Sequence, residues 1–159
     1  MTMRKLCAAA TLLTIAPAAS WAGDCIDGRD ANALKAASLQ QELMVAALTC
    51  NDIALYNRFV ISYRTQLQQS DETLQSYFRR GGTIADYHAY KTRLANQSSL
   101  DSLHDPLYCQ KANTAFGDAL DGRKSDLADV VATRDMPDGL DACETEASTG
   151  GAYRVHSRN

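Results

Sequence analysis

The residues with the clearest chemical potential gather in one short segment and just before it. They combine one histidine with aromatic hydroxyls and cations, and the members are Arg79, Arg80, Tyr87, His88, Tyr90, Lys91 and Arg93. A histidine can transfer a proton near neutral pH, and cations beside hydroxyls can hold an acidic ligand. The simpler interpretation is an exposed or hydrogen-bonded histidine on a helix, beside tyrosines of the core. The sequence therefore predicts a candidate binding surface here, which we call the basic surface.

Catalysis is a weaker interpretation of the same segment. His88 has a carboxylate nearby in Asp86, but residues two apart lie on different sides of a helix, so the pair is poorly placed for hydrolysis. The chain contains no His-Glu-x-x-His, no glycine-rich phosphate loop and no Gly-x-Ser-x-Gly elbow. We therefore expect a protein that is not an enzyme, with no catalytic residue and no cofactor. A hydrolase using His88 is the less favoured alternative.

The acidic segment 118–146 is a second chemical feature, with nine carboxylates and only three cations. A calcium loop of the EF-hand kind needs an acidic first residue and a glutamate at the twelfth position. When Gly122 is aligned with the glycine of that loop, these positions hold Gly117 and Ala128. The pattern therefore predicts a solvated face rather than metal ligands.

The first residues have the order of a secretory signal. Arg4 and Lys5 precede an apolar stretch over residues 6–16, and small residues end at Ala22. The apolar stretch is much shorter than the roughly 20 residues that cross a bilayer. We expect cleavage after Ala22, a periplasmic or secreted protein, and no membrane span.

Length and composition indicate one globular domain. The chain has 159 residues, of which 45% are hydrophobic, and its net charge is −3. An acidic chain of this size does not have the basic footprint of a nucleic-acid binder. We expect a helical domain over residues 23–146, with the acidic segment as its C-terminal part, and a flexible tail over 147–159.

Hydrophobic spacing predicts an all-α fold, an up-and-down bundle of four to five helices. A first helix covers 32–49, and a strict three-four alternation predicts one long helix over about 52–80. Because no glycine or proline separates these two, a continuous rod through Cys50 is the alternative. Further helices are expected after Thr83, with Ile84 on the inner face and fraying over 96–99, from Asp105-Pro106, and over 125–134. The heptad spacing also makes a second copy of the chain an alternative partner, in a homodimer that forms through residues 52–80.

Four cysteines follow the signal: Cys25, Cys50, Cys109 and Cys143. An even number in an exported chain predicts two disulfides, with three connectivities open. In an up-and-down bundle, Cys50 and Cys109 return to the same end, which favours their pairing and leaves Cys25 for Cys143.

Much of the domain, roughly residues 25–116, resembles a group of small exported alphaproteobacterial proteins with no assigned activity. The resemblance lies in the runs 46–52, 56–60, 70–71, 77–78, 87–96 and 108–109. It implies an envelope or secreted location and places Cys50 and Cys109 in the shared scaffold. We therefore expect a helical module that binds another envelope or secreted protein or ligand, or alternatively a periplasmic inhibitor or stress chaperone.

Overall fold

The computed structural model describes residues 25–137 and 140–143, and this part of the chain is all-α. Its six helices are α1 (Gly28–Thr49), α2 (Ile53–Ser62), α3 (Arg64–Gly81), α4 (Ile84–His104), α5 (Tyr108–Ala119) and α6 (Leu127–Val131). The expected disulfide-stapled bundle is confirmed. The expected signal over 1–22 and the tail over 147–159 lie outside the described residues.

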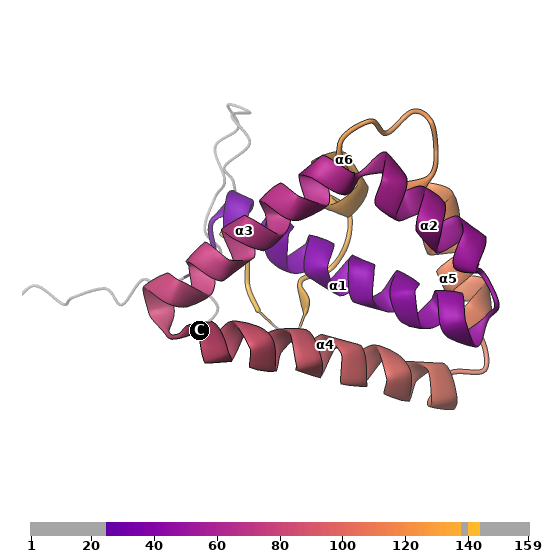
Figure 1. Cartoon of the computed structure of the whole chain (residues 1–159), viewed down its shortest axis with the longest axis horizontal. Helices are drawn as coiled ribbons and strands as arrows, with labels where there is room; N and C mark the ends of the chain where they lie inside the picture. Colours follow the sequence, from indigo (N-terminus) through magenta and orange to yellow (C-terminus); the bar gives the residue numbers. More distant parts are fainter. Residues whose placement is uncertain (1–24, 138–139, 144–159) are drawn as a thin grey trace, which may run out of the picture.

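The helix α1 lies at the centre of the bundle and contacts each of the other five helices (Figure 1). The chain leaves its far end, returns through α2 and α3, and runs forward again in α4, so α1 and α4 point the same way (Figure 1). Buried alanines on α1, among them Ala33, Ala36 and Ala46, let these neighbours approach closely. The up-and-down order therefore holds, with α1 as the axis.

The helix α1 begins and ends through local capping. The Asp27 carboxylate accepts hydrogen bonds from the backbone N–H groups of Arg29 and Asp30, which starts the helix at Gly28. At the other end Asn51 has a φ of 64°, in the left-handed region that asparagine tolerates. The N–H of Asp52 then donates to the carbonyl of Ala47, which closes a Schellman motif. The first two helices are therefore separate, and a continuous rod through Cys50 is excluded.

The single helix expected over 52–80 is wrong, because the chain bends at Tyr63 and forms α2 and α3. The hydroxyl of Tyr63 donates to the carbonyls of Ala119 and Lys124, at 2.8 Å and 2.9 Å. The bend lets α2 pack on α5 while α3 packs on α1 and α4. One straight helix could not reach both sets of partners. Leu67 and Leu74, which belong to the heptad stripe, are buried within the chain.

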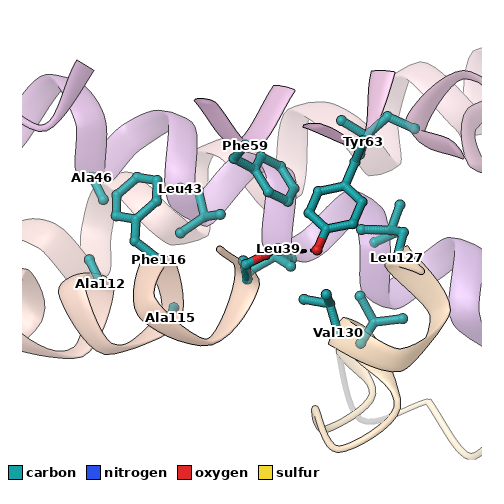
Figure 2. Packing of buried hydrophobic residues seen from close by; sticks show 14 of the residues in the cluster. Leu39, Leu43, Ala46, Phe59, Tyr63, Ala112, Ala115, Phe116, Leu127 and Val130 are labelled. Carbon is teal, nitrogen blue, oxygen red and sulfur yellow. Dashed lines mark hydrogen bonds between the residues drawn. The ribbon is translucent and has the colours of Figure 1, made fainter. Parts of the chain in front are cut away.

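The core has two clusters, one at each end of α1. The first packs α1 against α2, α5 and α6, with Leu43, Phe59 and Phe116 at its centre (Figure 2). The second joins the start of α1 to α3 and α4 through Leu34, Leu74 and Tyr90, among others. Phe59 is fully buried although it is not one of the residues of the apolar stripe predicted for the second helix.

Later helices differ from expectation mainly at their ends. Thr83 and Asp86 form the predicted capping box at the start of α4. The predicted fraying over 96–99 is wrong, since α4 continues to His104 and the side chain of Ser99 bonds the carbonyl of Ala95 inside it. Ile84, expected on the inner face, is 41% exposed. Asp105-Pro106 forms a turn before α5, and the last predicted helix shortens to α6.

Both predicted disulfides are confirmed. Cys50 pairs with Cys109 at the end where α1 meets α2 and α5 begins, and Cys25 pairs with Cys143. Beside the second disulfide, Ile26 and Ala142 form an isolated parallel bridge. The C-terminal segment is therefore tied to the entry of α1 by backbone and covalent contacts together.

Candidate functional site

The turn between α3 and α4 lies at one end of the bundle (Figure 1). Arg79 and Arg80 precede this turn at the end of α3, and the other members of the basic surface follow it along the first half of α4. The capping box of α4 lies at this turn. One oxygen of the Asp86 carboxylate accepts from the backbone N–H of Thr83 at 2.7 Å and from the Thr83 hydroxyl at 2.8 Å. A Cβ atom on Gly82 would lie 2.6 Å from that carboxylate. A side chain at position 82 would therefore displace the Asp86 carboxylate from the capping box.

The two arginines of the basic surface have different partners. Arg80 forms an ion pair with Asp30 at the start of α1, and Asp30 is buried with 6% of its surface exposed. The side chain of Arg80 is itself 58% exposed. Arg79 donates to the neutral amide of Gln75 at 3.4 Å and is exposed. The charge of Arg80 is thus committed within the fold, whereas Arg79 presents its charge at the surface.

A polar cluster between α3 and α4 uses two further members of the predicted surface. The hydroxyl of Tyr87 donates to the Asp71 carboxylate at 2.7 Å, and the Lys91 ammonium lies 3.3 Å from it. Burial alone would raise the pKa of Asp71, but hydrogen bonds from Tyr87 and Gln75 and the charge of Lys91 outweigh it, so the pKa is lowered. Burial, followed by the hydrogen bond to Asp71, raises the pKa of Tyr87 to about 12. These groups stabilise the contact between two helices.

The remaining members, His88, Tyr90 and Arg93, lie on different sides of α4. His88 is exposed, and its ring lies 5.0 Å from that of Tyr87 in an edge contact. Tyr90 is 1% exposed, and the guanidinium of Arg93 lies 5.3 Å from the centre of its ring. Asp86, the carboxylate considered as a partner for His88, bonds Thr83 instead. The structure therefore leaves His88 exposed to a partner, with its ring against that of the buried Tyr87.

A pocket of about 610 Å³ adjoins this surface, and the sequence did not indicate it. Its apolar lining comes from Ile26, Tyr77 and Phe78, and Arg80 and Asp86 are among its polar residues. The rings of Tyr77 and Phe78 meet edge to face at 5.2 Å. We call it the aromatic pocket. Adjacent aromatic residues were visible in the sequence, but no local pattern indicates that Ile26 and Asp30 lie next to them.

The acidic segment does not form a metal centre in the part of the chain that the structure describes. Asp121 pairs with Arg123 in the loop after α5, and Asp126 caps α6 by accepting from the N–H of Ala128. Among residues 25–137 and 140–143, no group of three or more histidine, cysteine, aspartate or glutamate side chains is arranged to hold a metal ion. Within the same residues no helix has the length and apolar character needed to cross a membrane.

Comparisons with models of protein families, with characterised proteins and with solved structures find no match to this chain.

Proposed function

We propose that this chain is a non-enzymatic, exported helical module that binds another envelope or secreted protein through its α3–α4 end. The aromatic pocket, lined by the start of α1 and the α3–α4 turn, carries the proposal, and exposed Arg79 and His88 lie on the same two helices, α3 and α4. Aromatic and arginine side chains at a pocket are the residue types that contribute most to protein–protein affinity.

The two parts of the site suit different parts of one partner segment. The walls formed by Ile26, Tyr77 and Phe78 suit an apolar side chain, because burying it removes apolar surface from water on both sides. Arg79 and His88 lie outside the pocket and suit a carboxylate. Arg80 is held by Asp30 and shapes the pocket wall. The partner segment therefore carries an apolar anchor next to an acidic residue.

Export is supported by the cysteines and by the signal pattern. All four cysteines after the predicted cleavage point form disulfides, and disulfides persist in oxidising compartments outside the cytosol.

A site-specific photo-crosslinking experiment tests the proposal. A crosslinking amino acid is placed at position 79 or 88, and as a control at position 123, where Arg123 is exposed in the loop after α5. We expect the same protein to be captured from 79 and 88 and not from 123. Purified, that protein should lose affinity for Arg79→Glu and for Tyr77→Ala, and bind Arg123→Glu as tightly as the unmodified chain. Equal capture from all three positions, or unchanged affinity in both site variants, contradicts the proposal.

A stress chaperone is a second candidate, favoured by a specific observation. Several large apolar side chains that do not line the aromatic pocket are exposed, including Leu48, Leu103 and Leu107. Apolar surface of this kind can hold unfolded chains. A chaperone should bind an apolar dye more strongly at acidic than at neutral pH and should suppress aggregation of a model protein. Unaltered dye binding and no suppression would rule against this candidate.

A further inference from the structure

A groove of about 900 Å³ lies between α1, α3 and α6, and it shares no lining residue with the aromatic pocket. On the α1 side, Ala33 and Ala36 contribute only methyl groups, and on the α6 side Leu127 and Val131 contribute apolar surface. All four of these residues are buried. The groove is open because the α1 side chains that line it are alanines, and a methyl group fills little of the space between the helices.

The α3 side of the groove is a row of amides and hydroxyls, formed by Gln66, Gln69, Ser70, Thr73 and Ser76. Spacings of three and four residues place this row on one face of the helix, and it extends about 15 Å at 1.5 Å per residue. Amides and hydroxyls both donate and accept hydrogen bonds. Within the described residues the Gln66 amide bonds the backbone of Ser125 and Leu127, and the hydroxyls of Thr73 and Ser76 donate to carbonyls of their own helix. The side chains of Gln69 and Ser70, between them, are left to bond the alternating donors and acceptors of an extended peptide backbone.

Charged side chains of opposite sign lie towards the two ends of this row. At one end a guanidinium nitrogen of Arg29 lies 3.5 Å from the hydroxyl of Thr73. At the other end Asp126 lies between Ser125 and Leu127, whose backbone groups bond the side chain of Gln66 at 3.2 Å and 2.5 Å. Because Gln66 and Thr73 are seven residues apart, these charges are separated by about 10 Å along α3.

A third charge, Glu72, lines the exposed rim next to Thr73. It lies near the end that Arg29 occupies and is the matched carboxylate control for Asp126. The groove as a whole carries Arg29, Glu72 and Asp126 as its charged residues.

We propose that this groove binds a short, free peptide of three or four residues in extended conformation. Its α-amino group lies at Asp126 and its α-carboxylate at Arg29. At 3.3–3.6 Å per residue, a chain of about three residues spans the separation of roughly 10 Å between the two charges. The apolar lining of Ala33, Ala36, Leu127 and Val131 accepts small side chains such as alanine. This site is independent of the protein-binding site proposed above, since the two share no residue.

Calorimetric titration with alanine peptides tests the proposal. Trialanine and tetraalanine are compared with tetraalanine that is acetylated at its N-terminus or amidated at its C-terminus. We expect saturable binding of the free peptides and a loss of at least about tenfold on blocking either end, because each block removes a charge-assisted hydrogen bond.

Two variants assign the ends of the peptide. Asp126→Asn removes the charge but retains the helix cap, since asparagine caps as well as aspartate, and Arg29→Gln removes the cation. Each should weaken free tetraalanine by at least about tenfold. Acetylation should then have no further effect on Asp126→Asn, and amidation none on Arg29→Gln. Glu72→Gln and Arg123→Gln are the matched controls: Arg123→Gln should bind as the unmodified chain does, and Glu72→Gln, which removes a negative charge near the proposed carboxylate end, should bind at least as tightly.

Several results would overturn the proposal. They are the absence of saturable binding up to millimolar peptide, equal affinity for free and blocked peptides, and equal affinity in the Asp126→Asn and Glu72→Gln variants. Binding of an uncharged oligosaccharide such as maltotriose, with none of trialanine, would show that the amide row serves a different ligand.

Discussion

Replacing Tyr63 by phenylalanine tests the explanation for the bend between α2 and α3. Tyr63 is 4% exposed, and its single hydroxyl proton is shared between the carbonyls of Ala119 and Lys124. Ala119 is the last residue of α5, so its carbonyl has no partner within that helix. The hydroxyl therefore satisfies one helix end and fixes the loop that follows it.

The magnitude follows from what the substitution leaves behind. Phenylalanine keeps the ring contact with Phe59, whose centre lies 5.5 Å away, so little packing is lost. Loss of the hydroxyl removes about 1 kcal/mol of net hydrogen-bond energy and leaves two carbonyls in a largely buried position. We expect a total loss of about 2 kcal/mol in the free energy of unfolding. For a domain of this size that corresponds to a fall of about 6 °C in Tm.

Urea unfolding followed by far-UV circular dichroism, with both disulfides intact, measures this loss. Tyr56→Phe is the control, since Tyr56 is half-buried against the same cluster and its hydroxyl has no hydrogen-bond partner within residues 25–137 and 140–143. We expect the control to change stability by less than about 0.5 kcal/mol, as substitutions without a named mechanism do. If Tyr63→Phe is no more destabilising than Tyr56→Phe, the hydroxyl does not hold the bend and the reasoning is refuted.

Three further predictions concern the staples, the titrating tyrosines and the end of α1. Replacing both Cys50 and Cys109 by serine, which opens a loop with a sequence separation of 59, should lower the free energy of unfolding by about 4 kcal/mol in urea; a loss below about 1 kcal/mol would contradict the staple. Burial, reinforced by Asp71 and Glu42 respectively, raises the pKa of Tyr87 and Tyr108 to about 12, whereas tyrosines of the unfolded chain lose their protons near 10. The unfolded state therefore binds fewer protons above pH 10, so the stability that these two tyrosines contribute, which is fully present below that pH, should fall between about pH 10 and 12. Unfolding curves recorded across that range check this, and unchanged midpoints would refute it. Because Asn51 has a φ of 64°, Asn51→Ala should cost about 1 kcal/mol while Asn51→Gly costs little; equal losses in thermal melts would show that the left-handed backbone is not the cause.

The candidate site illustrates how far residue patterns extend. The cluster around His88 was visible because its members are neighbours in the chain. The same pattern could not show that Tyr90 is buried, or that Lys91 pairs with Asp71, twenty residues earlier. The aromatic pocket depends on Ile26, which reaches Tyr77 and Phe78 only through packing of the start of α1 against the end of α3.

The predicted boundaries of the helices show the same division. The capping box of Thr83 and Asp86 involves residues three apart, and the structure confirms it. The fraying predicted over 96–99 fails because polar composition is a local measure, while α4 is supported along its length by α1. The cysteine pairing was predictable for a different reason: helices of alternating direction determine which chain positions return to the same end of a bundle.

By itself, the sequence determined the helical class, the helix caps and most helix positions. It also determined which segments carry the basic, the acidic and the apolar residues. These depend on interactions between residues a few positions apart, which any stretch of chain makes for itself. Only the tertiary structure decided the bend at Tyr63, the pairing of Arg80 with Asp30 fifty residues away, and the polar groove between α1, α3 and α6. Each of these requires distant segments to meet, and that meeting is governed by packing of the whole core rather than by any local pattern.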